Sequence, residues 1–167
     1  NPEKFNTLKD ISKYNELAFA KANDEVYNKQ KTFAESYVKP EHRMGIFSTY
    51  SANRYHSGQS TKMSFHVDSG DTEMGLTSMC VFREGDYDGA FLTFPRYNIA
   101  IDAPDNSVVI ADSLEVHGVT EIKGNGERFS CVAYMDNRLA TIGSAGKSEK
   151  LIGKYAAKTS GSLDEFL

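Results

Sequence analysis

From about residue 46, the sequence consists of short β-prone runs separated by chain-reversal signals. Val, Ile, Phe, Tyr and Thr are concentrated in the runs, while Gly, Asn, Asp and Pro lie in the intervals between them. The expected strands are GIFSTYS (45–51), KMSFHV (62–67), GLTSMCVF (75–82), GAFLTFP (89–95), NIAID (98–102), SVVIAD (107–112), EVHGV (115–119) and RFSCVAYM (128–135). About eight short strands at this spacing predict a sandwich, barrel or jelly roll and argue against a parallel α/β sheet.

The segment before these runs has a helical pattern. Between residues 5 and 38, apolar side chains recur mostly at three- and four-residue steps, with charged residues between them. The sequence Ala22–Asp24 can divide this helix in two, and Pro40 ends it. We therefore expect a mainly β fold with N-terminal helices packed on it, an α+β arrangement. Its parts are a helical support (1–45), a β core (46–142) and a flexible, linker-like tail (143–167) rich in Gly, Ser, Ala and Lys.

Composition narrows the class of protein. A length of 167 residues fits one domain, and a net charge of −4 lacks the basic footprint typical of nucleic-acid binding. No apolar run approaches membrane-spanning length and no signal-peptide pattern opens the chain, so we expect an intracellular location, nuclear if the source is eukaryotic. The chain begins at Asn1, which indicates a piece of a longer protein. Cys80 and Cys131 lie in apolar runs and are expected to be buried thiols, with a disulfide as the alternative.

Two histidines and an aspartate form a candidate metal site. His66 and Asp68 are two residues apart in a strand-like run, so their side chains are expected on one face of the sheet. His117 lies in a second such run, and a jelly roll can return a late strand beside an early one. Two imidazoles and one carboxylate on one side of a metal are typical of non-haem Fe(II) oxygenases, in which the remaining positions stay open. A two-residue motif alone has little specificity.

Arg128 adds a second feature, because it opens a late strand and has Ser130 two residues later on the same face. An arginine inside a β-barrel requires an anionic partner, since an unpaired buried guanidinium is very costly. A bidentate carboxylate ligand supplies that partner, and Ser130 can donate a further hydrogen bond. A salt bridge to an Asp or Glu of the chain is the alternative.

The order of His-x-Asp, distal His and Arg-x-Ser resembles the Fe(II)/2-oxoglutarate-dependent dioxygenases, and residues 46–140 look like one double-stranded β-helix. The segment FREGDYDGAFLTFPRYNIAIDAPDNSVVIADSLEVHGV (82–119) is similar to the TET/JBP group, which oxidises the 5-methyl group of pyrimidines in nucleic acid. The resemblance implies that the iron ligands and catalytic residues are His66, Asp68 and His117. It also implies that Arg128 and Ser130 hold the distal carboxylate of 2-oxoglutarate, with ascorbate as a reductant.

Three further residues are candidate binding residues. Asp71 matches a substrate-base position in the group, and a carboxylate can accept a hydrogen bond from the amino group of cytosine but not from O4 of thymine. Its alternative role is to cap the turn at residues 69–72. Similar enzymes place basic or polar residues upstream of His-x-Asp, so Arg54 is a candidate for co-substrate binding and His56 for substrate binding. Each is otherwise expected at the surface.

The resemblance implies a monomeric dioxygenase that converts 5-methylcytosine in DNA to 5-hydroxymethylcytosine and can oxidise that product further. Two alternatives stay open: a dioxygenase of the same fold that hydroxylates a protein side chain or small molecule, and a catalytically silent β-helix that serves as a binding module. The acidic charge favours the first alternative slightly.

Overall fold

The structure is a computed structural model that describes residues 2–40, 43–56 and 63–138. Two helices, α1 (Pro2–Ala22) and α2 (Asp24–Tyr37), precede the strands. The predicted break is confirmed, because the side chain of Asn23 accepts a hydrogen bond from the backbone N–H of Val26 and caps α2. No helix in the described part of the chain is long and apolar enough to cross a membrane.

In the described residues, eight strands form two four-stranded antiparallel sheets, which confirms the predicted jelly roll. The large sheet has the order β1-β8-β3-β6 and the small sheet the order β2-β7-β4-β5. Consecutive strands alternate between the two sheets except for β4 and β5, which pair with each other in the small sheet, and this is the order of a double-stranded β-helix. The strands are β1 (Thr49–His56), β2 (Met63–His66), β3 (Thr77–Gly89), β4 (Leu92–Phe94), β5 (Ile99–Ile101), β6 (Ser107–Ala111), β7 (His117–Val119) and β8 (Ile122–Tyr134), with a 3₁₀ turn η2 (Pro95–Tyr97) between β4 and β5.

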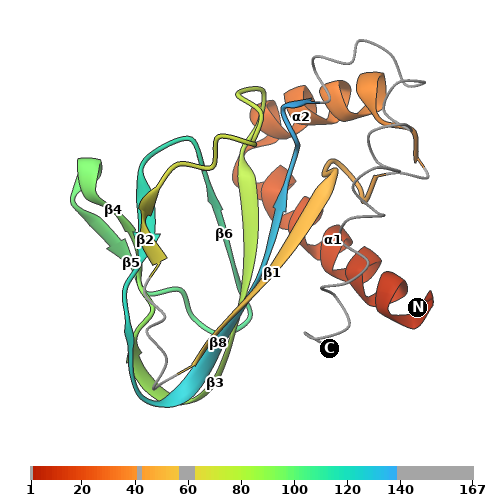
Figure 1. Ribbon diagram of the computed structural model, residues 1–167. Coiled ribbons are helices and arrows are strands. Elements are labelled where there is room, and N and C mark those ends of the chain that lie inside the picture. The colour runs from red at the N-terminus through yellow and green to blue at the C-terminus, as the bar shows by residue number, and fades with distance from the viewer. Residues whose placement is uncertain (1, 41–42, 57–62, 139–167) are drawn as a thin grey trace.

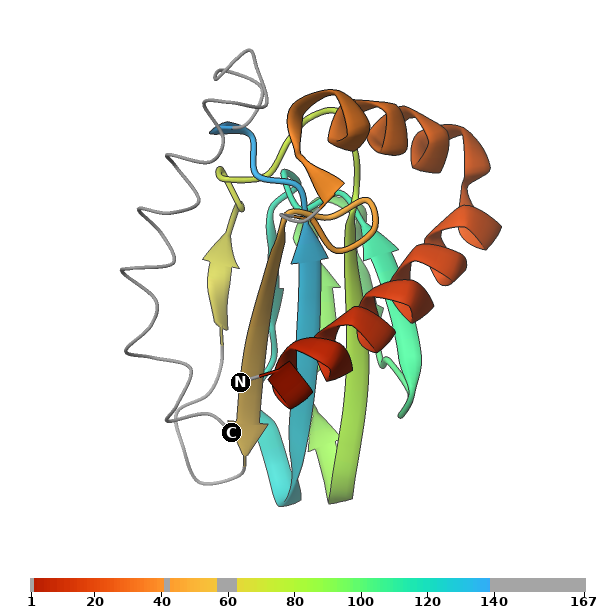
Figure 2. The ribbon, with the colours of Figure 1, turned by 90° about the vertical axis from the view of Figure 1, so that its right-hand side faces the viewer.

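The sheets face one another, α1 crosses the outer face of the large sheet, and α2 lies at one end of that sheet (Figures 1 and 2). One apolar cluster lies between the sheets and includes Val81, Leu92 and Phe94. Another lies between the helices and the large sheet, where Phe19 stacks against Phe47 with ring centroids 6.3 Å apart. The small sheet receives no such cover from the helices, so the large sheet is the more heavily supported half of the barrel.

The longest strands differ from the sequence expectation. The segments REGDYDG (83–89) and KGNGE (123–127) were expected to be turns, but they pair with each other and extend β3 and β8 to 13 residues each. Gly85 and Gly126 are direct cross-strand partners, and Gly85 has a φ of +76°. Glycine is therefore used here for close backbone approach within a ladder and not for chain reversal.

Both cysteines are buried free thiols, as predicted. Cys80 and Cys131 are cross-strand partners in β3 and β8, on the sheet face that α1 covers. Burial raises the pKa of Cys80 to about 11 and that of Cys131 to about 12, so both thiols stay protonated at neutral pH.

Replacing Gly85 with alanine is expected to lower the free energy of unfolding by about 1–3 kcal/mol. A Cβ there would lie 2.5 Å from the backbone oxygen of Asn125, and the positive φ is unfavourable for alanine. Urea denaturation measures the change. Gly70→Ala is the matched control, because a Cβ at Gly70 meets no atom within 4 Å. Equal stabilities for the two variants would contradict this account of the β3–β8 ladder.

Candidate active site

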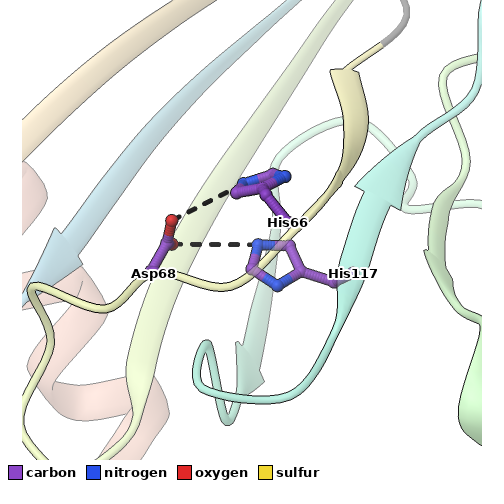
Figure 3. A group of neighbouring side chains, drawn as sticks. All are labelled: His66, Asp68 and His117. Carbon is purple, nitrogen blue, oxygen red and sulfur yellow. Dashed lines mark ion pairs between the residues drawn. The ribbon is translucent and has the colours of Figure 1, made fainter.

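His66, Asp68 and His117 lie together at one end of the space between the sheets, and their side chains point toward one another (Figure 3). His66 in β2 and His117 in β7 are direct cross-strand partners, and β2 ends at His66, so Asp68 lies in the loop that follows. The Nε2 atom of His66 is 3.5 Å from one Asp68 oxygen, and that of His117 is 3.8 Å from the other. Their ligand atoms all lie within 4.8 Å of one another.

The backbone fixes the orientation of both imidazoles. The Nδ1 atom of His66 lies 2.8 Å from the carbonyl oxygen of Ser64, and the Nδ1 atom of His117 lies 2.8 Å from that of Glu115. A carbonyl can only accept, so in each ring Nδ1 carries a proton and Nε2 is the nitrogen that can bind a metal. Both Nε2 atoms face Asp68, which is the arrangement that metal-binding histidines require.

The three side chains fit a divalent transition metal such as Fe(II). Ligands about 2.1 Å from one ion in neighbouring positions lie roughly 3 Å apart, and these atoms, which lie within 4.8 Å of one another, reach that spacing with small side-chain shifts. Two neutral imidazoles and one carboxylate on one side of the ion leave positions for further ligands. The donor set and the tautomers therefore agree with the predicted iron site.

A cavity of about 430 Å³ connects this cluster with Arg128. Arg128 is 2% exposed, and its guanidinium lies 5.6 Å from the centre of the Tyr55 ring. Its hydrogen-bond acceptor is the sulfur of Met79 at 3.5 Å, and no carboxylate of the described residues pairs with it. Burial accordingly lowers the pKa of this guanidinium. Within the described residues, the alternative of an internal salt bridge for Arg128 is not found.

Ser130 completes a candidate anion site beside Arg128. It is 3% exposed and lines the same cavity. Its hydroxyl is buried and has no hydrogen-bond partner among the described residues. A buried cation and a buried hydroxyl that both lack a strong acceptor fit a carboxylate ligand, which accepts from both. These two residues therefore fit the distal carboxylate of 2-oxoglutarate.

Asp71 lines another part of the cavity and is 7% exposed. One of its carboxylate oxygens accepts from Thr77 at 2.6 Å and also from Ser113. Burial raises the pKa of Asp71, whereas these two hydrogen bonds lower it. The carboxylate thus bonds residues of β3 and of the loop after β6, and these bonds account for its position better than a turn cap does.

The structure does not bring Arg54 or His56 to the cavity. Arg54 forms two hydrogen bonds with Glu127, at 3.0 and 2.9 Å, on the opposite face of β1. His56 is also absent from the cavity lining. Strand alternation explains both positions, because the β1 residues that line the cavity are the odd-numbered ones, Ser51, Asn53 and Tyr55.

Sequence reasoning missed several lining residues. Asn53, Thr77 and Ser113 line the cavity but stand outside any short motif. Asn53 could have been identified from the alternation of side chains between the two faces of β1, once one inward-facing residue of that strand was known. The aromatic rings of Tyr55 and Phe94 also line the cavity, whereas Tyr97 is exposed and donates to Glu115.

A double-stranded β-helix with two histidines and a carboxylate at its mouth and an arginine in its interior defines the structural class of this chain. No protein-family model matches it. The bifunctional helicase and thymine dioxygenase JBP2 of Trypanosoma brucei brucei is 32% identical over 103 residues, which are 59% of this chain and 9% of JBP2. This chain thus corresponds to a small part of that relative.

Among solved structures, NgTET1 in complex with 5mC DNA matches with a TM-score of 0.61 and 14% identity, over 75% of this chain and 48% of NgTET1. The viral collagen prolyl hydroxylase of Paramecium Bursaria Chlorella virus-1 has a TM-score of 0.37 and 14% identity over 68% of this chain and 73% of the hydroxylase, too low to establish a shared fold. The chain is similar to JBP2 in sequence and to NgTET1 in fold, which confirms the resemblance to the TET/JBP group.

Asp68→Ala is expected to weaken binding of Mn(II), a redox-stable substitute for Fe(II), by at least roughly a hundredfold. The variant removes the only carboxylate of the three-residue cluster and leaves two imidazoles. Titration calorimetry measures the affinity, and circular dichroism checks the fold. Asp10→Ala, an exposed carboxylate on α1, is the control that should bind Mn(II) as the unaltered protein does. Unchanged binding in Asp68→Ala would refute the metal site.

Proposed function

We propose that this chain is the catalytic part of an Fe(II)- and 2-oxoglutarate-dependent dioxygenase that oxidises the methyl group of a pyrimidine base in DNA. The observation that carries the proposal is the pairing, in one cavity, of the His66–Asp68–His117 cluster with a buried Arg128 that lacks a carboxylate partner in the described residues. The sequence similarity to a thymine dioxygenase and the fold of a 5mC DNA complex support the substrate class.

The proposed binding residues lie at two ends of the cavity, one end for the metal and the other for the co-substrate. His66, Asp68 and His117 would hold iron, while Arg128 and Ser130 would hold the distal carboxylate of 2-oxoglutarate. When bound, these groups supply the oxidising chemistry: one oxygen atom of O2 enters the methyl group, the other enters succinate, and 2-oxoglutarate loses CO2. Apolar side chains of the lining, including Leu92, Val109 and Val119, limit the access of water to the reacting groups.

We infer that the preferred base is 5-methylcytosine. Its product is 5-hydroxymethylcytosine, which the same reaction can oxidise further. Asp71 presents a carboxylate to the cavity, and Thr77 and Ser113 fix one of its oxygens. An ionised carboxylate accepts from the cytosine amino group and offers thymine O4 no donor. A base in a duplex would have to be flipped out, at a cost of a few kcal/mol that contacts in the cavity must offset.

Other expectations remain predictions. They are the role of ascorbate, a monomeric state, an intracellular and, in a eukaryote, nuclear location, and the domain boundaries at residues 45 and 142. The second boundary and the tail at 143–167 lie outside the described residues.

Incubation of 5-methylcytosine duplex DNA with protein, Fe(II), 2-oxoglutarate and ascorbate is expected to give oxidised methylcytosine and an equal amount of succinate. Nucleoside mass spectrometry and succinate quantification measure both. Arg128→Met is the negative control, because it removes the buried cation and keeps an apolar side chain of similar length. Succinate without an oxidised base would refute the DNA substrate and point to a protein or small molecule. Neither product from metal-loaded protein would refute the dioxygenase and favour a binding module.

Asp71→Asn is expected to lower the ratio of 5-methylcytosine to thymine oxidation roughly tenfold. The asparagine amide can turn either its oxygen toward the cytosine amino group or its NH2 toward thymine O4, so the discrimination of about 1–3 kcal/mol from one base contact is lost. Competition between the two bases in one duplex measures the ratio. Glu73→Gln, an exposed carboxylate two residues away, should keep the original ratio. An unchanged ratio in Asp71→Asn would contradict base recognition by Asp71.

A further inference from the structure

Gln30 of α2 is a fully buried polar side chain that the roles above do not use. Its side-chain oxygen accepts a hydrogen bond from the backbone N–H of Leu76 at 3.0 Å, and its NH2 donates to the carbonyl of Ile46 at 3.4 Å. Leu76 ends the loop between β2 and β3, and Ile46 precedes β1. A buried amide is costly unless it is hydrogen-bonded, so these two bonds fix the side chain between the helix and both segments.

The first half of the β2–β3 loop carries both carboxylates assigned to the site, Asp68 and Asp71. Backbone hydrogen bonds hold this half: the N–H of Asp68 donates to the carbonyl of Ser113, and the N–H of Thr72 donates to the carbonyl of Met135. The position of Asp68 is therefore set independently of α2.

The second half of the loop, residues 73–76, depends on Gln30. Among the described residues, its one hydrogen bond to another element is the bond from the N–H of Leu76 to Gln30. The Leu76 side chain also packs at the edge of the apolar cluster between the helices and the large sheet. Gly75 lies directly against the same amide, since a Cβ added there would be 2.0 Å from the side-chain oxygen of Gln30. The loop and the helix thus fit together at this point only with glycine.

The bond to Leu76 bears on Asp71 through the next residue in the chain. Thr77 begins β3, and its hydroxyl donates to a carboxylate oxygen of Asp71 at 2.6 Å. The backbone position of Leu76 therefore contributes to the position of the Thr77 hydroxyl, which in turn directs the Asp71 carboxylate in the cavity.

We propose that Gln30 is a positioning residue for base discrimination. It holds the end of the β2–β3 loop so that Thr77 keeps Asp71 directed at the amino group of the base. This inference rests on the proposed function. Gln30 is not among the residues that line the cavity, so α2 contributes to substrate choice from outside it.

The test compares Gln30→Met with Lys29→Met, a change at an exposed residue of the same helix. Methionine keeps the length of the Gln30 side chain and removes its amide donor and acceptor. Two quantities are measured: the ratio of 5-methylcytosine to thymine oxidation in one duplex, and the Mn(II) affinity by titration calorimetry. The ratio does not depend on how much of the protein is folded, so a loss of stability alone leaves it unchanged.

Gln30→Met is expected to lower the ratio roughly threefold to fivefold, the value of one ordinary hydrogen bond and less than the effect of Asp71→Asn. The Mn(II) affinity should stay within about twofold of the unaltered protein, because outer contacts of Asp68 are retained. Lys29→Met should match the unaltered protein in both quantities.

Gly75→Ala approaches the same contact from the loop side. Its Cβ should displace the Gln30 amide from Leu76 and lower the ratio to a similar extent. In a protein that already carries Gln30→Ala, the space for this Cβ is free. Adding Gly75→Ala should then cause no further fall, so the two effects should not add.

The outcomes separate this inference from the proposed function. If the unaltered protein oxidises neither base, the proposed function is refuted and the inference with it. If it oxidises both without preference, the dioxygenase stands, but base recognition by Asp71 and this inference are refuted. If Asp71→Asn lowers the ratio and Gln30→Met does not, the inference alone is refuted.

Three other results would also overturn the inference. They are an equal fall in Lys29→Met, a further fall when Gly75→Ala is added to Gln30→Ala, and a loss of Mn(II) affinity of roughly tenfold or more in Gln30→Met. Each would show a general loosening of the site and not an effect directed through Asp71.

Discussion

The buried guanidinium of Arg128 is the constraint on which the cavity depends. A charge at 2% exposure costs several kcal/mol unless something compensates it. The described residues offer it an aromatic ring and a methionine sulfur, which are weak partners. A bound anionic ligand would supply the missing charge. The Ser130 hydroxyl, also buried without a partner, has the same dependence on a ligand.

The metal cluster depends on a different constraint, the register between two very short strands. His66 and His117 meet because β2 and β7 pair at that position, and Asp68 reaches them from the loop after β2. The backbone N–H of Asp68 donates to the carbonyl of Ser113, and that of Asp71 donates to the carbonyl of Asp68. The first bond holds this loop against the loop after β6, and the second is a turn within the loop. A shift of β2 by one residue would turn His66 out of the cavity.

Much of this arrangement was predictable from the sequence. The alternation of β-prone runs and turn signals predicted the jelly roll. His66, Asp68 and His117 were predicted because together they can bind one metal ion, and Arg128 because a buried guanidinium requires an anionic partner. The glycines of β3 and β8 were misassigned to turns, since glycine serves both chain reversal and close backbone approach, and only the pairing distinguishes them. Arg54 was predicted for the cavity because similar enzymes place basic or polar residues upstream of His-x-Asp, whereas the face that a strand residue occupies is set by register.

The two sheets are unequal, and this inequality has a consequence for the order in which the site assembles. The anion site lies on β8, which pairs with β3, and both are 13-residue strands of the sheet that α1 covers. The two histidines of the metal cluster lie on β2 and β7, strands of four and three residues without that cover. Short, thinly supported strands open at a lower free energy than long packed ones. A metal ion bound by His66, Asp68 and His117 would join β2, β7 and the loop after β2, so it would also cross-link the small sheet. On this basis the half of the barrel that carries Arg128 would be formed without the metal, and metal binding would stabilise the other half.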